Sequence, residues 1–130
     1  MIEVNMGQSK VSRGLLKSHK FYDCVGAVVM GDSHGLLGHV PFNAELENLA
    51  DIFGENLNFF NGKTKGLVLG GIPRVVRDVG EYLQSLGVDV VSACVTKPTN
   101  GLWPRRDIHF MPVGRLVHYH VPEGVREYLL

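Results

Sequence analysis

Short apolar runs, rich in valine and separated by glycine-containing turns, are the feature that most constrains the fold of this 130-residue chain. Because β-branched side chains fit pleated and covered positions, such runs predict buried strands. They occupy Phe21–Met30, Leu36–Phe42, Thr64–Leu69 and Val88–Val95. A further strand is expected before Phe21. Two more are expected at the carboxy-terminal end, Asp107–Met111 and Arg115–His120, around a turn at Pro112–Gly114.

Two amphipathic helices are predicted between these strands. In the first, apolar residues recur with helical spacing from Leu46 to Phe60, following Asn43 as the capping residue and running to about Asn61. The second begins at Pro73, which a first helical turn accepts, and ends at Gly87. The last ten residues, VPEGVREYLL, are expected to form a short amphipathic helix. The order of elements predicts an α/β fold in which helices and a mixed sheet share a core.

Composition narrows the classes of function. With 13 basic and 13 acidic residues the net charge is zero, so the chain lacks the positive field that would concentrate nucleic acid around it. Two cysteines and an amino-terminal stretch without a signal peptide favour a reducing cytoplasm. No apolar run approaches the ~20 residues that span a bilayer, so membrane insertion is not expected. We therefore predict one cytoplasmic domain over residues 1–130.

The stretch FYDCVGAVVMGDSHGLLGHVPF, residues 21–42, places one cysteine and one histidine in a predicted hairpin. If residues 31–32 form a two-residue turn, Cys24 falls opposite His39 with Cβ atoms ~5 Å apart. A neighbouring imidazole can activate a thiol as a nucleophile and then protonate a leaving group. Asp23 is expected to point away, because adjacent strand residues face opposite sides. Both residues are also typical of a protein core, and the spacing leaves that interpretation open.

The sequence contains two other groups of side chains that could take part in chemistry. Cys94 lies in VSACV with no histidine placed to activate it, and is therefore interpreted as a core residue. A zinc site is an alternative function, in which His118 and His120 share one face of a strand and are joined by His34 or His39. Histidines on a terminal strand are more often surface polar residues.

Beyond these local features, DCVGAVVMGDSHGLLGHVPF resembles the nucleophile region of the chemotaxis-receptor glutamine deamidases, the CheD family. Further similar segments follow along almost the whole chain: KGLVLGG, VVRDVGEYLQSLGVDVVSACV and RRDIHFMPVGRLVHY. The resemblance implies a layered α/β sandwich with a mixed, largely antiparallel sheet and two main helices. It also implies that residues 1–130 form a single CheD-like domain.

The resemblance assigns the nucleophile to Cys24 and the base to His39. The third catalytic residue of the family is a threonine six residues before the cysteine. Its position is occupied here by Ser18, whose hydroxyl would orient the imidazole. Arg105 or Arg106 corresponds to a late arginine of the family. The implied reaction converts a protein glutamine to glutamate and ammonia, without a metal or an organic cofactor. A chemoreceptor is the implied substrate, and a CheC-like phosphatase the implied partner.

The chain also departs from the family pattern. KFYD stands before the cysteine where the family has a glycine-rich approach, and PTNGLWPRR replaces a glycine-rich loop. The altered approach favours a second interpretation, in which the chain is a CheD-like regulatory module that binds a partner without catalysis. The sequence leaves open whether Trp103 contacts that partner or covers the core.

Overall fold

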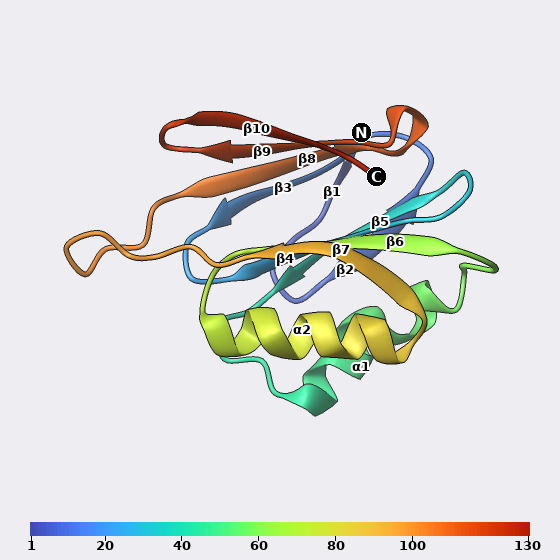
Figure 1. Ribbon diagram of the computed structural model, residues 1–130, viewed down its shortest axis with the longest axis horizontal. Helices are drawn as coiled ribbons and strands as arrows, with labels where there is room; N and C mark the ends of the chain where they lie inside the picture. The colour runs from blue at the N-terminus through green and yellow to red at the C-terminus, as the bar shows by residue number, and fades with distance from the viewer.

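Two sheets and two helices form three layers in the computed structural model, which describes residues 1–130 (Figure 1). In spatial order, the first sheet contains β1 (Ile2–Glu3), β3 (Leu16–Phe21), β8 (Arg106–Met111), β9 (Leu116–Val121) and β10 (Gly124–Leu129). The second contains β2 (Ser9–Ser12), β5 (Gly35–Val40), β4 (Val25–Met30), β6 (Thr64–Leu69) and β7 (Val88–Cys94). The helices are α1 (Leu46–Leu57) and α2 (Pro73–Ser85).

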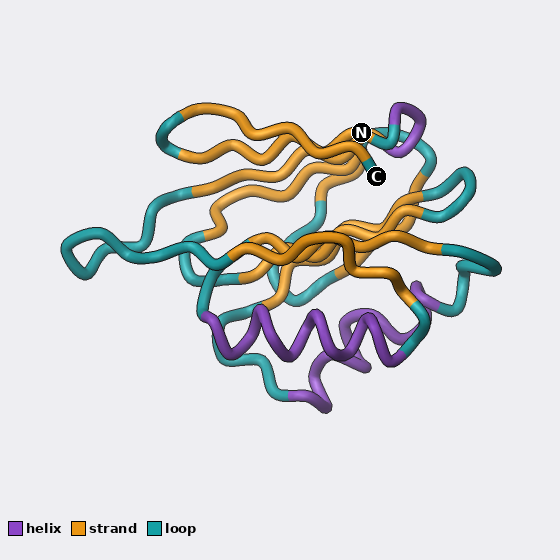
Figure 2. The backbone as a smooth tube through the Cα atoms, in the orientation of Figure 1, coloured by secondary structure: helices purple, strands orange, loops and turns teal.

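Both helices cover the outer side of the second sheet, whereas the first sheet has no helix over its outer side (Figure 2). The chain is a layered α/β sandwich, as predicted, but its strands divide between two mixed sheets instead of belonging to one. Each sheet contains one parallel pair, β1 with β3 and β6 with β7, and its other pairs are antiparallel. Neither helix is long and apolar enough to cross a membrane.

Strand β4 contributes to two separate apolar layers, which explains its unbroken run of apolar residues. Alternate side chains of a strand point to opposite faces. Val25, Ala27 and Val29 therefore pack toward the helices, while Val28 and Met30 pack toward the first sheet. A strand that is buried on both faces has no solvent side on which polar residues would alternate.

The helix ends agree with the prediction for α2 and differ for α1. Helix α2 begins at Pro73 and is followed by Gly87 in a left-handed conformation with φ 88°, as predicted. Helix α1 is capped by Glu45 instead of Asn43, because Glu45 and Asn48 satisfy each other's backbone N–H groups. It also ends at Leu57, before the predicted end at Asn61.

The carboxy-terminal helix was a wrong prediction, since residues 124–129 form strand β10. Gly124 pairs with Val121 and Leu129 with Leu116, so the segment folds back on β9 as a hairpin. A glycine with φ 145° follows the turn, a conformation that other residues rarely adopt. Pairing with an existing strand edge satisfies the backbone of a segment that is too short to be a stable helix by itself.

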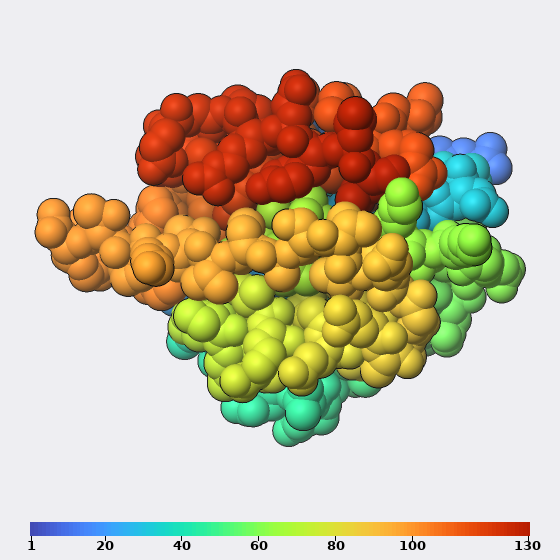
Figure 3. All heavy atoms as spheres, viewed as in Figure 1, coloured from blue at the N-terminus to red at the C-terminus, as the bar shows by residue number.

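The connection between β7 and β8, residues 95–105, projects from the body of the molecule (Figure 3). Trp103 lies in this connection and is half-buried. Together with Arg106 it lines a surface cavity of about 550 Å³. Trp103 is thus part of a cavity wall at the base of a projecting loop and does not lie over the apolar layers.

Replacement of Gly38 by alanine should loosen the contact between β5 and α1. A Cβ atom on Gly38 would lie 2.4 Å from Cε1 and 2.9 Å from Cζ of Phe53, whose ring is fully buried. We expect Gly38→Ala to lower the free energy of unfolding by about 1–3 kcal/mol in urea titrations. Gly54→Ala is the control, because nothing lies within 4 Å of its added methyl group. That change in α1 should stabilise by about 0.5–1 kcal/mol; equal effects of the two substitutions would contradict the packing described.

Candidate active site

The β4–β5 hairpin has a different register from the predicted one. Met30 pairs with Gly35, so residues 31–34 form the loop and His39 lies opposite Gly26 instead of Cys24. Cys24 stands just before β4 begins. The register differs from the prediction by two residues, and a shift of two preserves the face to which each side chain points. Cys24 packs in the apolar layer between the two sheets, and His39 stacks on Phe21 of β3, so both residues face the first sheet.

Glycine at position 26 lets the two sheets approach each other beside His39. A Cβ atom there would lie 2.2 Å from Cδ1 of Ile108 and 3.5 Å from the ring of Phe21. The Phe21 ring instead stacks on the imidazole of His39, with ring centroids 3.7 Å apart and planes 14° from parallel. This stacking on Phe21 of β3 fixes the plane of the His39 ring, which projects from β5 toward the first sheet.

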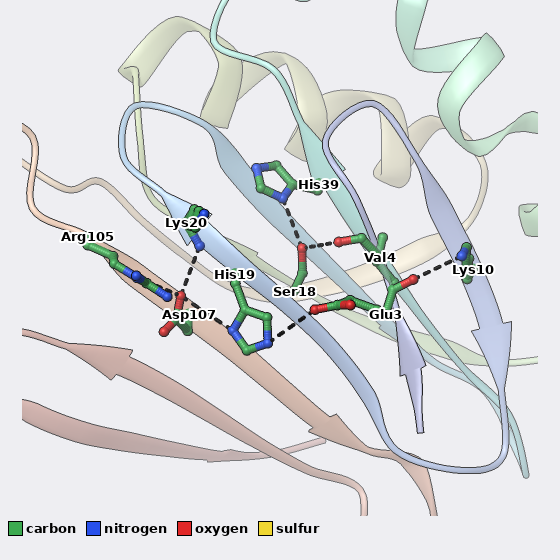
Figure 4. Close-up of polar contacts among 9 residues, drawn as sticks. All are labelled: Glu3, Val4, Lys10, Ser18, His19, Lys20, His39, Arg105 and Asp107. Atoms are coloured by element: carbon green, nitrogen blue, oxygen red, sulfur yellow. Dashed lines mark hydrogen bonds and ion pairs between the residues drawn. The ribbon is translucent and has the colours of Figure 1, made fainter.

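Ser18 lies against the imidazole of His39, the position that the resemblance to the CheD family gives it. Its hydroxyl lies 2.9 Å from Nδ1 of His39 and donates to the carbonyl oxygen of Val4 at 2.6 Å. Figure 4 shows Ser18 between these two partners. A hydroxyl has one proton, and the carbonyl can only accept it. Nδ1 must then carry the hydrogen that Ser18 accepts, which leaves Nε2 of the neutral ring unprotonated.

Nε2 of His39 is a buried base without a partner. The histidine is 3% exposed, and Nε2 makes no hydrogen bond. Burial, with a smaller effect of the nearby Arg106 charge, lowers the pKa of His39 to about 4. The ring is therefore neutral at neutral pH, and the lone pair on Nε2 is available to take a proton. An unsatisfied buried acceptor costs free energy, roughly 1–3 kcal/mol.

The thiol of Cys24 is protonated and covered in this structure. The residue is 5% exposed, and its sulfur lies 3.7 Å from the thioether sulfur of Met6. Burial is the main cause that raises the pKa of Cys24; the Asp23 carboxylate raises it further, while the Phe42 backbone amide and Arg106 oppose the shift. The thiol and the imidazole do not hydrogen-bond to each other, so the resting pair is neutral.

The expectation that Asp23 points away from the thiol is wrong. Its Oδ1 lies 4.0 Å from the Cys24 sulfur. The rule of alternating faces applies inside a strand, but residues 22–24 link β3 to β4 and belong to neither. The predicted strand Phe21–Met30 is therefore broken immediately before the candidate nucleophile.

Arg106, and not its neighbour Arg105, is the arginine that contacts the backbone of Cys24. Its buried guanidinium donates to the carbonyl oxygens of Tyr22, Cys24 and Gly70 and to the hydroxyl of Tyr119. The carbonyl of Cys24 accepts at 2.9 Å. No carboxylate pairs with this charge, so Arg106 places an uncompensated positive charge beside the backbone of Cys24.

The Gly70–Gly71 turn also approaches this backbone closely. Gly71 has φ 153°, and a Cβ atom there would lie 2.3 Å from the carbonyl oxygen of Cys24. Next to it, the N–H of Ile72 donates to the carbonyl of Asp23 at 3.1 Å. The paired glycines thus allow the segment between β6 and α2 to hold the residues before β4.

His39 and Met6 line a cavity of about 540 Å³, together with Glu3, Val4 and His19. Lys20 and Arg105 stand at its rim. Lys20 has a left-handed backbone with φ 62°, stabilised by donation of its N–H to Asp107 at 2.9 Å. Sequence reasoning did not find Met6, because nothing in its local sequence links it to a cysteine in another part of the chain.

The remaining predicted chemical residues are not brought into this site. Cys94 is partly buried and packs at the margin of the layer between the sheets. His118 and His120 face the outer side of the first sheet, where His120 contacts His109 with ring centroids 4.5 Å apart. His34 contacts Arg13 in a hairpin loop. No three histidine, cysteine or acidic side chains are grouped to hold a metal ion.

No protein-family model matches the chain, and no curated protein is similar to it. The contacts of Ser18, His39, Cys24 and Arg106, together with the motifs that resemble the CheD family, are the features that bear on function.

Acid should destabilise the protein through His39. Because its pKa is about 4 in the folded state and near 6.5 in the unfolded state, the unfolded chain binds more protons between these values. The contribution of His39 to the free energy of unfolding is fully present above pH 6.5 and is lost as the pH falls to 4 and below. It amounts to roughly 3 kcal/mol. In urea titrations across this pH range, His39→Asn should lose less unfolding free energy on acidification than the unmodified chain. His109, whose pKa is also lowered to about 4, should keep that loss above zero. Identical pH profiles would contradict this assignment.

Removal of the Arg106 side chain should destabilise far more than removal of its neighbour. Arg106→Met leaves several buried carbonyl oxygens without donors, and we expect a loss of about 3–5 kcal/mol in the free energy of unfolding. Arg105→Met is the matched control, since its side chain is 51% exposed and pairs with Asp107 only at the surface. That loss should stay below about 1 kcal/mol. Comparable losses measured for the two variants would contradict the role given to Arg106.

Proposed function

We propose that this chain is a cysteine-dependent protein-glutamine deamidase of the CheD kind. The observation that carries the proposal is the contact between Ser18 and His39, which leaves an unprotonated, unpartnered Nε2 on the same side of the sheet as Cys24. A structural histidine would ordinarily satisfy both ring nitrogens. The proposed reaction also needs a free thiol, which the reducing cytoplasm preserves.

In the proposed first step, Nε2 of His39 takes the thiol proton as the Cys24 sulfur bonds to the side-chain amide carbon of a glutamine. The tetrahedral intermediate breaks its C–N bond, and the imidazolium returns the proton so that ammonia leaves. Water then attacks the thioester, giving one proton to Nε2 and releasing glutamate, and the sulfur recovers a proton from the ring. The residues present supply every proton transfer, so neither a metal nor an organic cofactor takes part.

Two groups support the negative charge that this reaction develops. The Phe42 backbone amide and the Arg106 guanidinium both favour the ionised form of the Cys24 sulfur. Fixed donors and charges in a water-poor site stabilise a developing anion more strongly than water does. Because resting Cys24 and His39 are both neutral, the charge appears only during attack.

A chemoreceptor helix that contains glutamine is the proposed substrate, and it provides the assay. We expect the protein to release ammonia and to convert glutamine to glutamate, as followed by peptide mass. Cys24→Ala should abolish the conversion, while Cys94→Ala should retain it. Ser18→Ala should lower the turnover number by about 10–100-fold, and Ser18→Thr should restore most of it. Conversion that persists in Cys24→Ala, or that is absent with every receptor tested, would refute the proposal.

A second candidate function is a regulatory module that binds a chemoreceptor or a CheC-like phosphatase without catalysis. The specific observation that favours it is the covered thiol, whose pKa is raised. This candidate predicts partner binding by calorimetry that is equally strong in Cys24→Ala and in the unmodified chain. A deamidase would instead turn over its target, and Cys24→Ala would leave the bound glutamine intact.

A further inference from the structure

An exposed side chain, that of Met6, contacts the sulfur of the candidate nucleophile. The sulfur of Met6 lies 3.7 Å from the sulfur of Cys24, at the distance of a weak S–H donor and a thioether acceptor. Met6 is 62% exposed, whereas Cys24 is only 5% exposed. The methionine therefore contacts the thiol on its inner side and water on its outer side.

The backbone on both sides of Met6 is held in place. Residues 5–8 form a turn in which the N–H of Gln8 donates to the carbonyl of Asn5 at 3.0 Å, and Gly7 has φ 83°. Within the turn, the N–H of Gly7 donates to the carbonyl of His39 at 2.8 Å, and the carbonyl of Gln8 accepts from the N–H of His39 at 3.0 Å. Before it, the buried Val4 accepts from Ser18. The backbone around Met6 is thus anchored to both sheets, so a movement at this position would involve the Met6 side chain.

That side chain is suited to motion, because methionine has three rotatable side-chain bonds and adapts to different packing arrangements. Met6 and His39 line the same cavity of about 540 Å³. His39 is nearly fully buried, and its Nε2 has no partner. Rotation of Met6 away from Cys24 would extend this cavity to the thiol without breaking any backbone hydrogen bond of the turn.

We propose that Met6 is the gate of the candidate site: its side chain covers Cys24 at rest and swings aside to admit a glutamine carboxamide. The reference to glutamine rests on the proposed function. The covering of the thiol does not, and it applies equally to any reagent that approaches the sulfur.

Alkylation of Cys24 by iodoacetamide tests the gate directly. In a Cys94→Ser background, Cys24 is the only thiol, and the rate of its modification is read by mass. Met6→Ala removes the cover and should raise that rate by at least about tenfold at a fixed, near-neutral pH. Met6→Leu keeps a side chain of similar volume, so its Cys24 alkylation rate should stay within about twofold of the rate with Met6 present. Val113→Ala, which alters another exposed apolar side chain, should leave the rate unchanged.

A control separates opening of the gate from loosening of the whole chain. In a Cys24→Ser background, alkylation of Cys94 should proceed at the same rate with and without the Met6→Ala substitution, and the urea midpoints should agree. Equal labelling of Cys24 in the unmodified and Met6→Ala chains would overturn the gate. So would a matching acceleration at Cys94.

Gate and function fail in different ways. Fast labelling of Met6→Ala without deamidation by any variant would support the gate and reject the deamidase. Deamidation by the unmodified chain, together with equal labelling of Cys24 in the unmodified and Met6→Ala chains, would support the deamidase and reject the gate.

Discussion

The hydrogen bonds of Ser18 are the interaction on which the candidate site depends. A single hydroxyl joins the first sheet, through β3, to His39 on the second sheet and to the backbone after β1. A hydrogen bond of this kind contributes only about 1 kcal/mol to stability. A preference of about 1.4 kcal/mol nevertheless changes an equilibrium tenfold, so even a modest contact selects the tautomer of a buried ring. Because the Ser18 hydroxyl donates its proton to Val4, Nδ1 of His39 carries the ring hydrogen and Nε2 is the basic nitrogen.

Arg106 acts on both members of the Cys24–His39 pair in the same direction. Its charge favours loss of a proton from the thiol and opposes gain of a proton by the imidazole. Moving the proton from sulfur to nitrogen at rest therefore gains little from Arg106. The balance changes when a carbonyl accepts the electron pair of the sulfur, because negative charge then develops on an oxygen of the substrate. This electrostatic arrangement favours general-base attack by a neutral thiol over a standing thiolate–imidazolium pair.

The face shared by Cys24 and His39 could be predicted from sequence, but their register could not. Their separation is odd, so any loop with an even number of residues places both on one side of the hairpin. The actual loop length depends on contacts around residues 31–34, where the N–H of Gly31 donates to the carbonyl of His34 at 2.9 Å. The orientation of Asp23 was predicted wrongly because Arg106 binds carbonyls in residues 22–24 and interrupts the strand there.

Elements defined by local chemistry were easier to predict than those defined by a distant partner. Helix α2, with Pro73 at its start and Gly87 after its end, was visible in its own residues. Strand β10 depends on pairing with β9, and the division into two sheets depends on contacts between distant segments. The position of Met6 over Cys24 belongs to this second class. It requires both the turn at residues 5–8 and the pairing of that turn with His39.

The proposed gate reconciles the raised pKa of the Cys24 thiol with the nucleophilic role proposed for it. Burial is the largest cause of that shift, and burial at this position includes the contact with Met6. Moving the side chain aside hydrates the sulfur, which lowers the cost of ionising it. In the proposed deamidase, reactivity would appear only when a bound substrate stabilises the open position of Met6, since a ligand shifts an equilibrium by its differential affinity for the two states. A deamidase and a binding module built on this fold would thus differ in one quantity, the free energy needed to hold Met6 away from the thiol.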